Sequence, residues 1–402
     1  MNKRFKCFVT GILIMVMMLV TTGAHPSVVS AASKPELFKK SALISVGESL
    51  ELKFKNSLKG SKYSWSSSNK KVAEVSSKGI VKGINAGTAT IYCNISVSSK
   101  KYKLSCNITV DKLKKIPISY TAKDENPGIV EKLNYKTKTY DSKNKNLKKY
   151  VNVYLPYGYN SEDTSKKYNI LYLMHGGGEN VDTIFGGAGK TSMFMKIIDN
   201  MIYNGEIEPL IIVTPTFYNT GNNDAMALVK NFHQELVNDI IPAVESKYNS
   251  YASSTTTEDL IATRSHRAFG GFSMGSACTW YTFINCLDYF QYFMPFSGDC
   301  WALGQGAGGT QPKKTAEMLA DVVKKSGYKT NEFNIFSATG SIDIAEGNLT
   351  KQINEMIKLK DTFIFSDDFT KGNLHYMVKD GGSHIWYFVH QYLYNYLPYV
   401  FK

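Results

Sequence analysis

The sequence predicts an α/β domain, with a mostly parallel sheet and helices on both faces, preceded by a small all-β sandwich. From Tyr150 onward, short apolar runs alternate with segments of helical periodicity, which is the pattern of an α/β domain. Residues 35–112 read instead as short strands separated by turns. The charge divides in the same way: residues 32–150 carry 25 Lys and no Arg against 9 acids, whereas residues 151–402 carry 19 Lys and Arg against 25 acids. Two modules with different partners are therefore expected within a chain of net charge +13.

The N-terminal segment, residues 1–32, has the three parts of a signal peptide. A basic start with Lys3 and Arg4 precedes the apolar run 8–20, and small residues at 29–32 offer a cleavage site. The apolar run is short for a membrane span, which needs about 20 residues. We expect a secreted protein that has no membrane association after cleavage. An uncleaved N-terminal anchor is the alternative.

The first module, residues 35–112, shows two-residue alternation, with Gly79, Gly83 and Gly87 at turn-like intervals. Its segments "WSSSN", "VAEV", "GIVKG" and "GTA" resemble the bacterial Ig-like domain of group 2. In such domains these residues shape turns and core, so the resemblance implies no chemistry here. Trp65 is interpreted as a core anchor.

Two cysteines lie on either side of the hairpin tip that is expected at Ser99–Lys100. The alternation puts Cys93 and Cys106 on the apolar face and opposite each other. A cross-strand disulfide and two buried free thiols both fit, because disulfide geometry is demanding. The remaining cysteines of the mature chain have no metal-ligand spacing and are interpreted as core or near-site thiols. They are Cys278, Cys286 and Cys300.

Residues 113–147, rich in Lys, Asn, Ser and Thr, are predicted to form a linker and the entry to the second domain, residues 148–402. Several predicted strands of this domain are continuous apolar runs, as expected of a sheet buried on both faces. The strands are expected within residues 150–156, 168–178, 208–217, 267–275, 292–299, 332–341 and 373–382. Helical periodicity marks residues 191–205, 225–248 and 314–327.

The stretch "RAFGGFSMGSACTW" contains the pattern GxSxG around Ser273. The pattern alone is weak, but here a strand-like run enters it and a helix-like run leaves it, as a nucleophile elbow requires. Gly271 and Gly275 permit the tight turn. The sequence therefore predicts that Ser273 is a nucleophile, with a structural turn serine as the alternative.

An oxyanion site and a base are expected elsewhere in the same domain. The stretch "HGGGEN", beginning at His175, follows an apolar strand, so the Gly177 amide is expected to join the Met274 amide in binding an oxyanion. His384 follows the last predicted strand, where an imidazole can reach back over the sheet edge as a base. The other histidines nearby are interpreted as structural. They are His175, His375 and His390.

The acid has two candidates. Asp343 follows the penultimate strand and lies between Ser273 and His384 in the chain, so it is favoured. Asp299, after the preceding strand, is the rival. Asp299 is otherwise expected to brace the site or to shape the substrate pocket with Trp301.

Residues 150–402 closely resemble the feruloyl esterase modules of bacterial xylanases, in carbohydrate esterase family 1 of the α/β-hydrolase fold. Segments that carry the resemblance include "ILYLMHGGGEN", "GGFSMGS", "YFMPFSGDCW", "ATGSIDIAEGN" and "GGSHIWYFVHQYLYNYLPYVF". The resemblance implies a nucleophile at Ser273, an acid at Asp343 and a base at His384. One departure is Ser276-Ala277, where relatives often carry another glycine.

The resemblance implies a feruloyl or related hydroxycinnamoyl ester of plant arabinoxylan as substrate. An aromatic acyl group needs flat apolar walls, and Trp301 and Trp386 are expected on loops near the triad, with core positions as the alternative. The alternative functions are an acetylxylan or other carbohydrate esterase and, in another class, a cell-wall-associated binding protein.

No cofactor or metal is expected in either module. The Lys-rich first module can favour anionic cell-wall polymers or acidic polysaccharide, or it is simply a solvated surface. Nucleic acid is disfavoured by export and by the lack of a recognisable binding motif.

Overall fold

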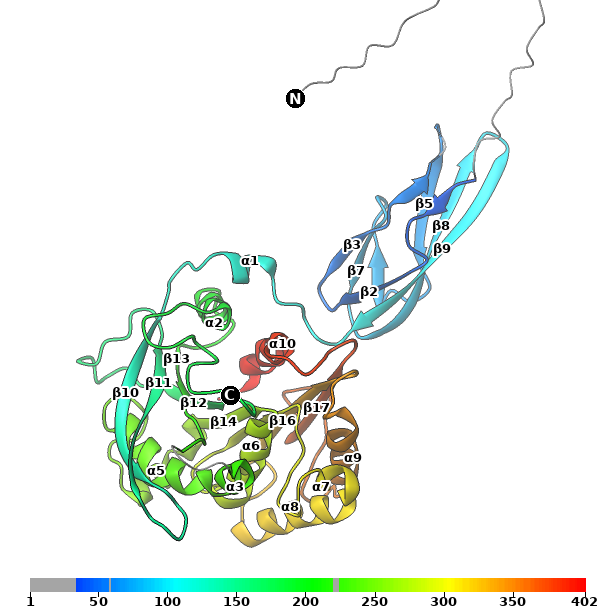
Figure 1. Cartoon of the computed structure of the whole chain (residues 1–402). Helices are drawn as coiled ribbons and strands as arrows, with labels where there is room; N and C mark the ends of the chain where they lie inside the picture. Colours follow the sequence, from blue (N-terminus) through cyan, green and yellow to red (C-terminus); the bar gives the residue numbers. More distant parts are fainter. Residues whose placement is uncertain (1–33, 58, 220–223) are drawn as a thin grey trace, which may run out of the picture.

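The computed structural model describes residues 34–57, 59–219 and 224–402, which form an all-β domain and an α/β domain (Figure 1). The predicted signal peptide, residues 1–32, lies outside the described residues. The fold class expected from the sequence is confirmed in both domains.

The N-terminal domain is a sandwich of short strands around a small apolar core. Ile91, Ile108 and Val81 are fully buried in this core, and Trp65 packs against it. Two-residue alternation supplies the buried face, as the burial pattern of β8 (Gly87–Val97) shows. Its sheets have the orders β2 (Ser41–Ser45), β9 (Lys100–Asp111), β8, β5 (Lys62–Ser67); β3 (Ser49–Glu51), β7 (Ile80–Gly83), β6 (Ala73–Val75); and β1 (Glu36–Leu37), β4 (Phe54–Asn56).

The hairpin of β8 and β9 corrects one expectation about its cysteines. Cys93 pairs with Leu104, and Cys106 pairs with Ile91, so the two thiols lie diagonally rather than opposite each other. Both cysteines are free and fully buried. Sequence alternation fixes which face a residue occupies, but the register depends on the turn, which here places Val97 opposite Lys100.

The α/β domain is built on an eight-stranded mixed sheet. The strand β10 and its neighbour β11 are antiparallel, β11 is antiparallel to β13, and the remaining neighbours are parallel. The carboxyl ends of the parallel strands therefore meet at one edge. In spatial order the strands are β10 (Ile129–Lys138), β11 (Asn146–Leu155), β13 (Leu210–Thr214), β12 (Asn169–Met174), β14 (Arg267–Phe272), β15 (Tyr292–Phe296), β16 (Asn334–Gly340) and β17 (Leu374–Lys379).

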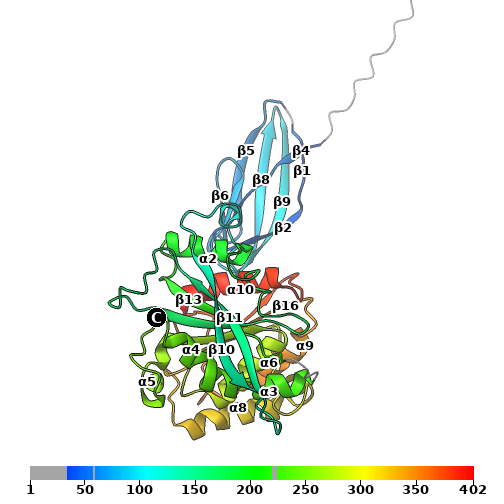
Figure 2. The same cartoon turned by 60° about the vertical axis from the view of Figure 1, so that its left-hand side comes forward.

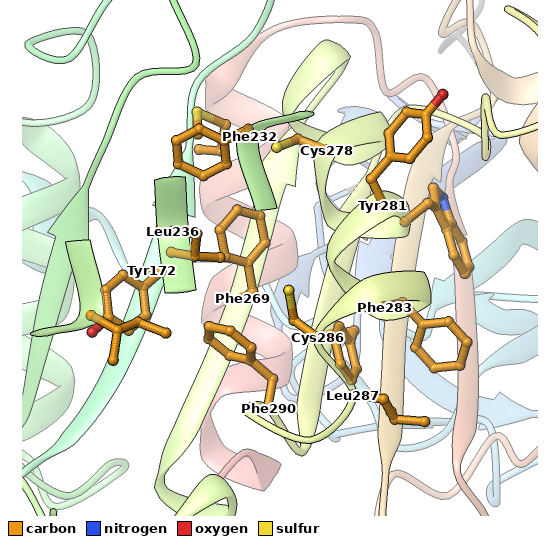
Figure 3. Packing of buried hydrophobic residues seen from close by; sticks show 14 of the residues in the cluster. Tyr172, Phe232, Leu236, Phe269, Cys278, Tyr281, Phe283, Cys286, Leu287 and Phe290 are labelled. Atoms are coloured by element: carbon orange, nitrogen blue, oxygen red, sulfur yellow. The ribbon is translucent and has the colours of Figure 1, made fainter. Parts of the chain in front are cut away.

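Helices cover both faces of this sheet, and the buried apolar residues form one cluster on each face. The helices α2 (Met193–Tyr203) and α10 (Trp386–Tyr396) pack on one face. Figure 3 shows part of the other cluster, where Phe232 and Leu236 lie beside Phe269. The helical segments on this second face are α3 (Ala225–Glu235), η1 (Leu236–Ile240), α4 (Ile241–Glu245), α6 (Met274–Asn285), α8 (Pro312–Ser326) and α9 (Glu346–Met356).

Shorter helical segments lie in the connections: α1 (Ile118–Ala122), α5 (Thr257–Ala262), η2 (Arg264–His266), α7 (Ala307–Thr310) and η3 (Leu397–Tyr399). Across the described parts of the chain, no helix is both long enough and apolar enough to cross a membrane.

The segment that the sequence predicts as a linker, residues 113–147, is more structured than expected. It contains α1 and the ten-residue strand β10, which pairs along its whole length with β11 (Figure 2). The missed strand is an edge strand rich in lysine, so it has no apolar run to reveal it. The junction of the two domains is fixed by a half-buried ion pair between Asp111 and Lys379 and by hydrogen bonds between the Lys114 backbone and Asn395.

Candidate active site

The strand β14 and the helix α6 meet at Ser273, which adopts φ 59° and ψ −115°. Close packing explains the two flanking glycines. A Cβ on Gly271 would lie 2.4 Å from the Gly275 carbonyl oxygen, and one on Gly275 would lie 2.5 Å from the His175 carbonyl oxygen. The strained turn therefore has no room for side chains on either side, and it lifts the serine above the sheet edge.

His384 joins Ser273 to Asp343. Its Nε2 lies 2.8 Å from Ser273 Oγ, and its Nδ1 lies 2.7 Å from Asp343 Oδ1. Because a carboxylate only accepts hydrogen bonds, Nδ1 carries the proton and Nε2 accepts from the serine hydroxyl. The Phe272 ring packs against the imidazole with a centroid distance of 4.5 Å. These contacts align a hydroxyl, a base and an acid in one relay.

The Asp343 carboxyl is held as an anion. Burial raises its pKa, but the hydrogen bonds from His384 Nδ1–H and the Ala345 amide lower that pKa below its ordinary value overall. Its side chain has no exposed surface. A buried carboxylate of this kind orients an imidazole and stabilises its protonated form.

The glycine loop after β12 brings Gly177 beside Met274, since a Cβ on Gly177 would lie 2.5 Å from Met274 Sδ. The Met274 amide is the first of α6, where an N–H has no intrahelical partner. Both residues line the same pocket as Ser273. Their two backbone amides are therefore the candidate donors for an oxyanion that develops at the serine.

His175, at the start of this loop, is buried and uses both ring nitrogens. Its Nδ1 donates to the Gly176 carbonyl at 2.8 Å, and its Nε2 accepts from the Thr216 hydroxyl at 2.7 Å. Burial lowers its pKa to about 4, so the ring is neutral. This is the structural position expected from the sequence.

A pocket of about 310 Å³ opens beside the relay. Trp301 and Asp299 line this pocket together with Ser273 and His384. Asp299 accepts from the Trp301 indole at 3.2 Å and from the Gly308 amide at 2.8 Å, and it makes no hydrogen bond to His384. Further lining residues had not been singled out from the sequence: Ser297, Gly298, Gln305, Gly306, Ile344, Ala345 and Asn348.

Trp386 takes a different place from the one expected. It is the first residue of α10, its ring packs edge-on against Phe272, and it does not line the pocket. Its indole N–H donates to both carboxylate oxygens of Glu179 at 2.9 Å. The sequence placed it near the triad, but the periodicity of α10 could not show which way the ring points. In the described part of the chain, no group of three or more His, Cys, Asp or Glu residues is arranged to hold a metal ion.

Two family models match the chain, one for each domain. The bacterial Ig-like domain (group 2) matches residues 36–103, and the family described as "Putative esterase" matches residues 142–391. The chain belongs to this esterase family. The match spans the sheet from β11 to β17 and the three residues of the relay.

The esterase domain also has characterised relatives. Endo-1,4-beta-xylanase Y of Acetivibrio thermocellus is 50% identical over 253 residues, which are 63% of this chain and 22% of that protein. An endo-1,4-beta-xylanase/feruloyl esterase of Xylanibacter ruminicola is 30% identical over 183 residues, which are 44% of this chain and 22% of that protein. This chain therefore spans about a fifth of the length of these curated relatives.

A solved structure is similar to most of the chain. It is a mutant of the feruloyl esterase module from Clostridium thermocellum, complexed with sinapinate. It has a TM-score of 0.63 and 44% sequence identity, and the match covers 73% of this chain and 94% of that chain.

Proposed function

We propose that the protein is a secreted serine esterase that hydrolyses feruloyl or related hydroxycinnamoyl esters on plant arabinoxylan. The observation that carries the proposal is the continuous relay from Ser273 Oγ through His384 to Asp343 beside an open pocket. The similarity to a xylanase, and to a feruloyl esterase module that binds sinapinate, supports the substrate class.

The mechanism follows from the positions of these groups. His384 Nε2 takes the Ser273 proton as Oγ attacks the ester carbonyl carbon, and the Gly177 and Met274 amides bind the resulting oxyanion. His384 then gives the proton to the departing alcohol as the C–O bond breaks, which leaves an acyl-serine. Water attacks the acyl carbon with the same base, releases the acid and restores the serine.

The pocket lining suits an aromatic acyl group with polar substituents. Trp301 offers a flat apolar wall, and Ile344, on the loop after β16, adds an apolar side chain to the same pocket. Asp299, Gln305 and Asn348 offer hydrogen-bonding groups in the same space. An acetyl group would leave most of this pocket empty, which favours a hydroxycinnamoyl ester over acetylxylan.

The test is release of ferulic acid from methyl ferulate and from feruloylated arabinoxylan by the wild type and by Ser273→Ala. Loss of the nucleophile is expected to lower kcat by about 10⁶-fold. Cleavage of acetylated xylan without release of ferulate would reject the substrate class while leaving the relay in place. A folded wild type that cleaves no ester would favour a cell-wall-associated binding protein.

A second role concerns the Ig-like domain, and one surface feature favours it. A hollow of about 480 Å³ lies on the face of β5, β8 and β9, and it includes Lys62, Lys101 and Lys103 beside Asn94. These side chains are exposed, and the ion pairs described for this domain's own strands involve other lysines. Three exposed ammonium groups beside hydroxyl and amide groups suit a carboxylate-bearing polysaccharide.

The full-length variant Lys62→Glu/Lys101→Glu/Lys103→Glu is therefore expected to lose retention on carboxylated xylan. The matched control is Lys70→Glu/Lys78→Glu/Lys82→Glu, which makes the same charge change at exposed lysines outside the hollow. Retention of the wild type should weaken as salt rises, because exposed charges are screened. Equal retention of the two variants on carboxylated xylan would reject the site. If the Lys62, Lys101 and Lys103 variant loses retention only on isolated bacterial cell walls, the ligand is a wall polymer instead.

A further inference from the structure

Consecutive backbone amides in the glycine loop differ in their hydrogen-bond partners. The Gly176 N–H donates to Glu179 Oε2 at 2.6 Å, and the Gly178 N–H donates to the Tyr218 hydroxyl at 2.8 Å. Among the described residues, the Gly177 N–H between them has no such partner. The side chains around the loop therefore occupy the outer two donors, and the middle donor belongs to a residue that lines the pocket.

Glu179 has a second contact, which leads to the other half of the site. Both of its carboxylate oxygens accept from the Trp386 indole N–H at 2.9 Å. Trp386 lies two residues after His384, and its ring packs on Phe272 with a centroid distance of 5.3 Å. Phe272 in turn packs against the His384 imidazole. One carboxylate thus joins the glycine loop to the structure that supports the base.

We infer that Glu179 is a positioning residue that fixes the positions of the Gly177 amide and the His384 imidazole relative to Ser273. The inference rests on the proposed ester hydrolysis at this site and adds a residue to it. Glu179 does not line the pocket, so it acts through the loop and through Trp386 rather than on the substrate. Its two contacts explain why an acidic side chain follows the three glycines.

The expected effect of Glu179 is on the transition state. Without the carboxylate, the Gly176 amide loses its acceptor and the bond from Gly178 to Tyr218 alone holds the loop, so the Gly177 donor is less firmly positioned. Misplacement of a catalytic group by about 1 Å can cost about 10²-fold in rate. Binding of the substrate's ground state, which does not need the oxyanion donor, should change little.

The experiment measures Glu179→Ala with p-nitrophenyl acetate, methyl ferulate and an arylboronic acid, which forms a tetrahedral adduct with a nucleophilic serine. We expect kcat and boronate affinity to fall together, by about 10- to 100-fold. KM and inhibition by free ferulate should stay within about twofold of the wild type. The matched control is Glu131→Ala, which removes a half-exposed glutamate that bonds to Lys247 and Tyr248 away from the site.

A double-mutant cycle separates positioning from general structural support. Trp386→Phe removes the indole N–H and keeps an aromatic ring against Phe272. If Glu179 acts partly through this bond, the double variant should be no worse than Glu179→Ala, since the two substitutions break the same link. Additive losses would overturn the link to the base and leave only the link to the glycine loop.

Unchanged kcat and boronate affinity in a folded Glu179→Ala variant would overturn the inference. If that variant does not fold, Glu179→Gln is measured, because a glutamine keeps one acceptor for the two donors. An intermediate loss is then expected, and full activity would overturn the inference. Cleavage of p-nitrophenyl acetate and binding of the boronate do not require a preference for hydroxycinnamoyl groups. A wild type that cleaves p-nitrophenyl acetate but not methyl ferulate would therefore reject only the proposed substrate.

Discussion

The loops after β15 and β16 each carry a buried aspartate three residues beyond the strand, yet the two carboxylates face different partners. Asp343 bonds to His384, whereas Asp299 bonds to Trp301 and the Gly308 amide. The strands are parallel neighbours, so both acids follow strands that end at the same edge of the sheet. Equivalent placement along the chain does not decide which acid serves the base; the direction of each loop does.

The two carboxylates also differ in their electrostatics. Burial raises the pKa of both, but in Asp343 the hydrogen bonds to His384 and the Ala345 amide reverse that effect. In Asp299, burial prevails over the bonds from Gly308 and Trp301, and the pKa is raised. Folding therefore favours the ionised carboxyl in the Asp343 loop and disfavours it in the Asp299 loop.

The largest expected difference between the loops is in the chemical step. Asp343→Asn puts an amide opposite His384 Nδ1 and favours the wrong tautomer, so kcat should fall by about 10⁴-fold. The fall should be similar for acetyl and hydroxycinnamoyl esters, because the relay is common to both.

Asp299→Asn is the matched control, and it should keep most of the wild-type kcat. Steady-state kinetics on both esters checks this pair of variants. If Asp299→Asn loses as much as Asp343→Asn, the two loops do not divide the work as their contacts indicate.

The sequence predicts the residues of the relay because the ends of its strands can be located from apolar runs. Apolar runs located β14, β16 and β17, and the residues that follow them could be assigned by order to a nucleophile, an acid and a base. The sequence pattern does not show which residues act through a hydrogen bond to the backbone. Glu179 stood in the quoted glycine motif, but only its bond to the Gly176 amide reveals its place.

The differences between the predicted and the observed fold also come from properties that a local sequence pattern does not show. The edge strand β10 has no continuous apolar run, so its lysines suggested a linker. The diagonal offset of Cys93 and Cys106 depends on register, which alternation leaves open. The direction of the Trp386 ring depends on how α10 docks, which is a tertiary property.

A smaller expected effect concerns substrate choice in the β15 loop. Trp301→Ala removes the aromatic wall of the pocket, so the ratio of kcat/KM for methyl ferulate to that for p-nitrophenyl acetate should fall by about tenfold. The control is Tyr157→Ala, which removes an exposed aromatic ring at a different surface hollow. An unchanged ratio in Trp301→Ala would show that this loop does not select the acyl group.

The smallest expected effect is on stability, and it has opposite signs in the two loops. A carboxyl whose pKa is lowered on folding, like Asp343, stabilises the protein at neutral pH, and this is lost as pH falls through its folded pKa. A carboxyl whose pKa is raised, like Asp299, costs stability as pH rises from its ordinary value of 3.8 toward its folded pKa.

Replacement of Asp299 by Asn removes that cost, because an amide does not ionise, and it keeps one oxygen to accept from Gly308. The difference in unfolding free energy between Asp299→Asn and the wild type should therefore shift toward the variant as pH rises from 4 to 7. Denaturant unfolding at both pH values measures the shift. Because only Asp299 differs between the proteins, a shift toward the wild type would mean that the bonds from Trp301 and Gly308 outweigh burial. Folding would then favour the ionised form of both Asp299 and Asp343. The two loops would differ only in the hydrogen-bond partners of their carboxylates.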